Sequence, residues 1–278
     1  MLWNFKKPIS RNSVVLIRRL MVILRNTFLN SMILVLSFGL SAQTLEKKIH
    51  KQSFSLFSLS STFQVSPKWS IISDVQERSF MKPIKQNQLS LRIQVQHNLG
   101  NDWTAAGGTS YVLTRAGDPT SLSTLIIPEI RINQDLNYKQ RFSGFGFSHR
   151  YRMEERFIRR TMNDTLIEGH RFIERLSYTL SFEFNLLKSK NNFRSLAFKA
   201  SNGIFINAGK HIVYNTFDQN RLYTGLNYQL YKNIAIELGY INIFQQRNSG
   251  NEFYNRNIVS FSINHKMRNQ YQAVKHEL

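Results

Sequence analysis

The sequence has no cysteine, few charged residues and no long apolar run. The lack of cysteine excludes disulfides, zinc sites with thiolate ligands, catalytic thiols and a lipid anchor on a cysteine. A helix needs about 18 consecutive apolar residues to cross a bilayer, so a polytopic helical membrane protein is excluded. Charged residues make up only 19% of the chain, which argues against a disordered polyelectrolyte and against a coiled coil.

Hydrophobic and aromatic residues are plentiful instead. Of the 278 residues, 42% are hydrophobic and 13% are aromatic, a composition that favours a folded, strand-rich protein. The length permits one large domain or two small ones. Because no linker or low-complexity tract interrupts the chain, the sequence predicts one domain.

Residues 1–42 have the features of a secretory signal peptide. They contain six basic residues and no acidic residue, and an apolar stretch runs from Met32 to Leu40. Small residues follow up to Ala42, so cleavage before Gln43 is expected. Met21 is an alternative start of the chain that would give the signal a more usual length. A buried core helix is the competing interpretation of the apolar stretch.

The rest of the chain is strongly basic. Without residues 1–42 it keeps 31 Lys and Arg against 17 Asp and Glu, a formal charge of +14. For an exported protein, the partners expected from this charge are the phosphates of outer-membrane lipids and lipopolysaccharide, and not nucleic acid. A solvated basic surface without a specific partner is the alternative.

Alternation of apolar and polar residues dominates the chain after the signal peptide. A helix, with its period of 3.6 residues, cannot keep two such faces apart, whereas a strand does. Near residue 226, Leu226 belongs to the apolar face and Asn227 to the polar one. In another run, one face carries Leu176, Tyr178, Leu180, Phe182, Phe184 and Leu186, and the other carries Arg175, Ser177, Thr179, Ser181, Glu183 and Asn185.

About eleven runs of this kind follow one another. Many exceed the usual strand of soluble proteins, and about ten residues with alternating faces is what a tilted membrane-spanning strand needs. The sequence therefore predicts an all-β fold, a single antiparallel transmembrane β-barrel of about 10–12 strands. Its expected parts are a signal peptide (1–42), the barrel (43–267) and a polar C-terminal tail (268–278). The runs are 52–65, 69–80, 88–98, 103–114, 127–138, 142–157, 171–186, 193–207, 220–231, 234–245 and 254–266.

The connections between the runs are expected to alternate between short turns and long loops, as in outer-membrane barrels. Eleven strands conflict with the even number of strands in bacterial barrels. We therefore expect either a further strand near 43–50 or two runs that are wrongly divided. Short turns are expected at 66–68, 99–102, 139–141 and 231–233, and long loops near 81–87, 115–126, 158–170, 208–219 and 246–253.

Four stretches carry a resemblance to a known family. They are 128–132 (PEIRI), 149–157 (HRYRMEERF), 201–207 (SNGIFIN) and 217–223 (FDQNRLY), the last continuing to Tyr240. In this order they resemble the family called domain of unknown function 2490 (DUF2490), over about residues 60–266. The resemblance implies an outer-membrane β-barrel without an established activity, inserted by the barrel-assembly machinery.

The densest polar cluster lies on one strand face. Arg150, Arg152, Glu154 and Arg156 are spaced by two, so all four point into the same lumen. Carboxylates of the flanking runs, Glu129, Asp135 and Glu183, are expected against this row. We interpret the charges as ion-paired struts, with a selectivity lining for an anionic solute as the alternative. The full predicted lumen cluster is Glu129, Arg131, Asp135, Arg150, Arg152, Glu154, Arg156, Arg175, Glu183, Arg221 and Glu237.

No catalytic or metal-binding motif is found in the sequence. Ser148 and His149 fall on opposite faces of a strand and cannot act as a pair, so we expect no enzyme, no cofactor and no metal. One short match remains. Asp164-Thr165-Leu166, expected in a long loop, resembles a periplasmic O-glycosylation site, with Thr165 as the acceptor.

The sequence thus predicts a protein of the bacterial outer membrane that is either structural or a narrow pore for small solutes or lipidic ligands. An outer-membrane lipid hydrolase built on a barrel is one alternative. A soluble periplasmic β-protein with the same alternation is the other.

Overall fold

The computed structural model describes residues 47–187, 194–210 and 212–268. The predicted signal peptide and all but the first residue of the predicted tail lie outside these residues. Every regular element in the described part is a β-strand. Among the described residues, no helix has the length and apolar character needed to cross a membrane.

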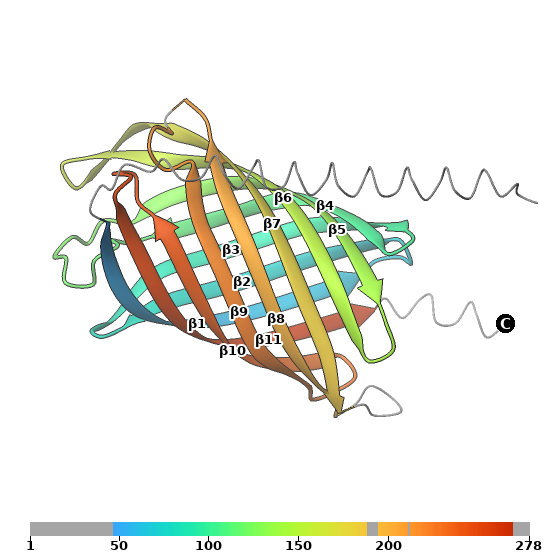
Figure 1. Cartoon of the computed structure of the whole chain (residues 1–278). Helices are drawn as coiled ribbons and strands as arrows, with labels where there is room; N and C mark the ends of the chain where they lie inside the picture. The colour runs from blue at the N-terminus through green and yellow to red at the C-terminus, as the bar shows by residue number, and fades with distance from the viewer. Residues whose placement is uncertain (1–46, 188–193, 211, 269–278) are drawn as a thin grey trace, which may run out of the picture. The chain divides into compact units, whose positions relative to one another are not determined.

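Eleven strands of the described chain close into one barrel (Figure 1). Each strand from β2 to β10 pairs with its two neighbours in sequence, and β1 and β11 close the circle. The strands are β1 (Lys48–Gln64), β2 (Trp69–Met81), β3 (Ile84–Gly100), β4 (Trp103–Thr114), β5 (Ile127–Arg141), β6 (Phe145–Met162), β7 (Thr165–Leu187), β8 (Leu196–Ala208), β9 (Phe217–Gln229), β10 (Ile234–Gln246) and β11 (Glu252–Arg268).

The predicted runs coincide with these strands, but several connections differ from the prediction. The long loops expected at 81–87 and 158–170 are wrong, because the strands continue and meet in two-residue hairpins at 82–83 and 163–164. Asn163 and Asp164 both have a positive φ, as a two-residue hairpin turn of type I′ requires. The turn expected at 139–141 belongs to β5, and the chain reverses at 142–144 instead.

The barrel closes with a parallel pair, which corrects the expectation of a purely antiparallel sheet. Strands joined by hairpins alternate in direction, so the first and the eleventh run the same way. β1 and β11 pair along seventeen residues, from Lys48 opposite Glu252 to Gln64 opposite Arg268. The expected extra strand near 43–50 is absent from the described residues, which instead place Lys48–His50 at the start of β1.

An apolar cluster inside the barrel supports this seam. Phe54 of β1 and Ile258 of β11 are opposite in register, and both are almost fully buried. Phe80 of β2 and Ile243 of β10 complete the cluster, and the rings of Phe54 and Phe80 lie 4.4 Å apart. Burial of these four side chains therefore favours closure between the two ends of the sheet.

The barrel has two different ends. The loop end carries the connections β2–β3, β4–β5, β6–β7, β8–β9 and β10–β11, and the turn end carries the other five connections. β1 begins at the loop end and β11 finishes at the turn end (Figure 1). β6 and β7, of 18 and 23 residues, form the longest hairpin of the loop end.

The apolar faces predicted from the alternation point outward on every strand, and the polar faces line the lumen. Leu226 is 45% exposed, whereas the side chain of its neighbour Asn227 donates a hydrogen bond to Glu237 inside the barrel. Ile93 and Leu238 are 53% and 58% exposed. The protein is therefore more apolar on its surface than in most of its interior.

Two β-bulges break the alternation and turn extra polar side chains inward. Between β8 and β9 the register skips Asp218, since Phe205 faces Gln219 and Ile206 faces Phe217. Between β2 and β3 it skips Asn87 in the same way. Asp218 and Asn87 are both almost fully buried, in agreement with the tendency of bulges to re-aim a side chain.

Candidate functional site

The lumen contains a network of ion pairs that begins at Glu129 on β5. Its carboxylate accepts paired hydrogen bonds from Arg156 on β6, with Nε–Oε1 and Nη2–Oε2 distances of 2.6 and 3.1 Å. Arg131, two residues along β5, makes the same two contacts at the same distances. Glu129 is 4% exposed, so two guanidinium groups compensate a single buried carboxylate.

A second pair joins β5 and β6 nearer the middle of the barrel. Arg152 donates to both carboxylate oxygens of Asp135, at 2.5 and 2.7 Å. Gln94 of β3 donates to the same carboxylate at 3.1 Å. This contact connects the pair to β3, which lies beyond β4 in the sheet. Arg92 and Asp74 form a further pair, with an Nη2–Oδ2 distance of 2.6 Å.

Arg175 on β7 connects three strands. Its Nη2 lies 2.6 Å from Oε2 of Glu154 on β6, and its Nη1 lies 3.0 Å from Oδ2 of Asp218 on β9. Asp218 can reach it only because the bulge turns that side chain inward. From Asp218 the chain of hydrogen bonds continues through Gln245 and Arg256 to Gln52 on β1.

The loop between β4 and β5 joins this network at the loop end. Gln52 donates to the carbonyl oxygen of Gly117 at 2.6 Å, and Asn87 donates to that of Ala116 at 3.3 Å. Lys85 donates to the carbonyl of Ser121 at 2.7 Å. Inward side chains of β1 and β3 therefore hold this loop.

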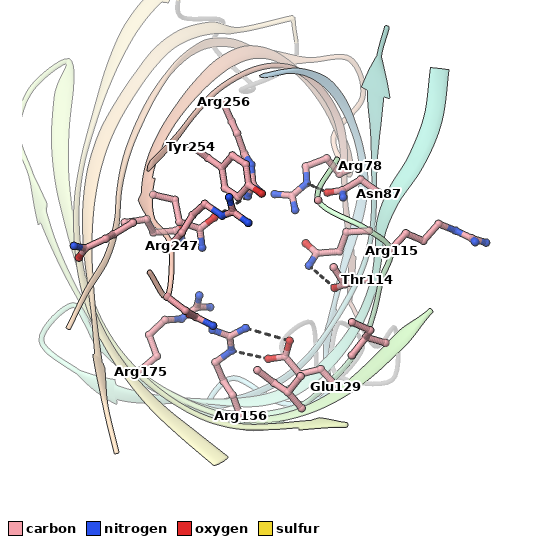
Figure 2. A pocket seen from close by; sticks show the side chains of 18 of the residues that line it. Arg78, Asn87, Thr114, Arg115, Glu129, Arg156, Arg175, Arg247, Tyr254 and Arg256 are labelled. Carbon is pink, nitrogen blue, oxygen red and sulfur yellow. Dashed lines mark hydrogen bonds and ion pairs between the residues drawn. The ribbon is translucent and has the colours of Figure 1, made fainter. Parts of the chain in front are cut away.

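Two cavities occupy the two ends of the lumen. The one at the loop end has a volume of about 580 Å³ and is called here the arginine vestibule (Figure 2). The one at the turn end has a volume of about 510 Å³. On β3, β5, β6 and β7, the inward residues that lie between the two linings form a layer that is called here the waist. The waist consists of Ser90, Arg92, Gln94, Asn133, Asp135, Arg152, Glu154 and Ser177.

Eight arginines line the vestibule, and seven of them, all except Arg115, belong to the lumen network or point toward the cavity. Of these seven, three form no ion pair within the described residues. These three are Arg78, Arg221 and Arg256. Figure 2 shows Arg78, Arg247 and Arg256 directed into the open space, beside Tyr254. The guanidinium carbons of Arg247 and Arg256 lie over the ring of Tyr254, at 5.0 and 4.4 Å from its centroid.

The turn-end cavity holds the remaining predicted residues of the lumen. Glu237 binds Lys199 at 2.6 Å and accepts a hydrogen bond from Tyr223 at 2.6 Å. Glu183 also lines this cavity, but it lies opposite Gly146 in register, four residues away from Arg150. It therefore makes no pair with the arginine row, unlike Glu129 and Asp135. Within the described residues, Arg150 makes a long contact of 3.5 Å to Thr179 and no ion pair, and its Nε is buried without a hydrogen-bond partner.

Several polar and charged residues of the lumen are absent from the cluster predicted from the sequence. Asp218 and Asn87 were missed because bulges place them against the alternation. Arg78, Arg92 and Arg256 do follow the inward alternation of their strands, and that alternation was the signal that could have located them.

Thr165 is the first residue of β7 and stands directly after the two-residue turn, not within a long loop. Its hydroxyl donates to the carbonyl of Met162 at 2.7 Å, and the preceding Asp164 accepts from Ser123. Thr165 is exposed. No group of three or more His, Asp or Glu side chains in the described residues is arranged to hold a metal ion.

Comparison with known proteins gives one match. The model of the family described as "Protein of unknown function (DUF2490)" matches residues 55–254, which span the barrel from β1 to the first residues of β11. No curated protein and no solved structure matches the chain. The match covers most of the chain and all the polar residues of the waist, and the chain therefore belongs to the DUF2490 family.

Proposed function

We propose that this protein is a bacterial outer-membrane barrel, exported through the signal peptide predicted at 1–42, with a structural role or the role of a very narrow pore. The observation that carries the proposal is the inverted distribution of side chains. Large apolar residues are exposed on the outer face of all eleven strands, while ion-paired residues fill the lumen. In water such a surface would be an extensive aggregation hazard, whereas in lipid it is the expected one.

Aromatic pairs at the turn end support the same proposal. Trp69 packs on His97 with ring centroids 4.1 Å apart, and Trp103 stacks on Tyr138 at 4.7 Å. Phe142 and Phe145 stack at 4.8 Å in the neighbouring turn. Girdles of aromatic residues at this level are typical of barrels whose rim lies at the membrane interface.

The waist supports a structural role rather than that of an open pore. Arg152 binds both carboxylate oxygens of Asp135, Arg92 binds one oxygen of Asp74, and Asn133 donates to Ser110 at 2.7 Å. Moving these side chains aside would expose unpaired charges in a confined space, which is costly. We therefore propose a low conductance and no catalytic role.

The partners that follow from this proposal are the lipids and lipopolysaccharide of the outer membrane, together with the barrel-assembly machinery during insertion. The basic surplus of the chain favours contact with lipid phosphates.

Fractionation tests the location. The protein should sediment with outer membranes and should resist extraction with carbonate or urea. On a gel, a folded barrel should migrate differently before and after boiling. Recovery of the folded protein in the soluble periplasmic fraction would reject the membrane proposal and favour the soluble β-protein instead.

A further inference from the structure

The arginine vestibule has more positive charge than its carboxylates compensate. Seven of its arginines, all except Arg115, belong to this inward network. Four carboxylates face them, and each is already engaged: Glu129 with Arg131 and Arg156, Glu154 and Asp218 with Arg175, and Glu252 with Arg247. Three guanidinium groups, those of Arg78, Arg221 and Arg256, therefore remain without an anionic partner in the described residues.

The contacts of these three arginines leave hydrogen-bond donors unused. Arg78 donates from Nε to Asn87, and Arg256 donates to the neutral amides of Gln52 and Gln245. Nε of Arg221 is buried and has no hydrogen-bond partner. A guanidinium group carries five N–H donors, so each of the three has donors to offer to a further group.

Arg78 also lies close enough to the other two cations to be repelled by both. The charges of Arg221 and Arg256 both act on Arg78, and Arg131 adds to this repulsion. The faces of the Phe54 and Phe205 rings cover parts of Arg256, Arg78 and Arg221, at 5.0 to 5.7 Å. Rigid aromatic surfaces thus hold like charges around one cavity, an arrangement that an anion would relieve.

We propose that the arginine vestibule binds a multiply charged oxyanion through a phosphate group, such as a phosphate ester or a diphosphate. Guanidinium groups match the oxygens of a phosphate in paired geometry. A single carboxylate carries one negative charge and would leave two of the three arginines uncompensated. The cavity of about 580 Å³ has room for such a solute, and Tyr254 offers an aromatic edge beside the anion.

Binding of inorganic diphosphate to the detergent-solubilised full-length barrel is the direct test. Isothermal titration calorimetry should show saturable binding to one site, with a dissociation constant below about 1 mM. Inorganic phosphate should compete more weakly, since it carries less charge. Absence of saturable binding of diphosphate at this concentration overturns the proposal.

Substitutions then locate the site. Arg256→Gln and Arg78→Gln should each weaken diphosphate binding about tenfold or more, since each removes charge-assisted hydrogen bonds. Arg141→Gln is the matched control, because Arg141 lies about 40 Å along β5 from Glu129, at the turn end, and is paired with Asp102. An equal loss of affinity in Arg141→Gln would indicate attraction by the general basic charge and would overturn the site.

Folding is checked for each variant by the change of gel mobility on boiling. If Arg256→Gln does not fold, Arg256→Lys keeps the charge but loses the paired donors, and it should still weaken binding. Unchanged affinity in a folded Arg256→Lys and a folded Arg78→Gln would place the anion elsewhere and overturn the proposal.

The phosphate group can belong to a free solute or to a lipid. Titration in bilayer discs of phosphatidylcholine, and then in discs that also contain phosphatidylglycerol, separates these sources. Loss of diphosphate binding in the second kind of disc supports a lipid headgroup, and retained binding supports a solute. The proposal is separate from the membrane location: a barrel of the outer-membrane fraction that binds no diphosphate overturns only the anion site.

Discussion

Arg152 and Asp135 face each other across β5 and β6 and share two hydrogen bonds of 2.5 and 2.7 Å at the centre of the lumen. Both side chains are largely buried, at 11% and 5% exposure. A pair of this kind restrains two neighbouring strands and fills the space between the two cavities. Removing this ion pair therefore distinguishes a structural role of the waist from a role in ion selectivity.

Arg152→Gln should destabilise the barrel. The substitution leaves the buried carboxylate of Asp135 without its cation, which costs about 3–5 kcal/mol in comparable buried pairs. Thermal unfolding in detergent, followed by circular dichroism, should show a clearly lower Tm. Arg150→Gln is the control, since Arg150 lies two residues away on the same face and has no carboxylate partner within the described residues. It should leave the Tm unchanged or raise it.

Conductance provides the second readout for Arg152→Gln. If the role of the waist is structural, the current through a planar bilayer should stay small in the variant. A clear change of anion preference at an unchanged Tm would instead favour the selectivity lining.

Leu226→Arg should harm assembly more than Asn227→Arg. Leu226 points outward, three residues before β9 ends at the turn end, and a lipid-facing arginine costs up to about 2–4 kcal/mol at the midplane of a barrel and less toward the interface. Asn227 points into the lumen, where a new arginine lies beside Glu237. The folded, heat-modifiable fraction in outer membranes should be lower for the first variant. Equal folded yields would contradict the assignment of outer and inner faces.

Gly108→Ala should be destabilising, whereas Gly107→Ala should be tolerated. A Cβ on Gly108 would come within 2.1 Å of the carbonyl oxygen of Ile93 and 2.6 Å of the Cα of Gln94, so the backbone of β3 or β4 would have to move. A Cβ on Gly107 meets nothing closer than 4.0 Å. Overpacking of this kind costs about 1–3 kcal/mol. Denaturant unfolding should give a lower midpoint for Gly108→Ala than for Gly107→Ala. Similar midpoints would argue against the close approach of β3 and β4 at Gly108.

Cleavage between Ala42 and Gln43 is the expected processing step. The basic residues, the apolar stretch and the small residues that follow it predict a signal peptide. N-terminal sequencing of the membrane-bound protein should begin at Gln43. A mature chain that starts at Met1 or Met21 would contradict the signal peptide.

The sequence by itself determined which side chains share a face. Period-two alternation is a local property, since consecutive strand residues point to opposite sides whatever the partner strand is. It therefore placed Leu226 outward and Asn227 inward, and it gathered Arg150, Arg152 and Arg156 on one inner face. The ranges of the strands follow from the same alternation, whereas the DUF2490 family was predicted from the resemblance of four sequence stretches.

Only the tertiary structure decided which of these residues meet. Pairing depends on register, on bulges and on closure, and these arise from contacts between residues far apart in the chain. Register directed Asp135 to Arg152 and left Glu183 opposite Gly146, and a bulge brought Asp218 to Arg175. The parallel seam brought Arg256 of the last strand near Arg78 of the second, because a barrel joins the ends of its sheet. The uncompensated positive charge of the vestibule comes from side chains of six strands and one loop. No local pattern in the sequence could predict that these side chains lie around one cavity.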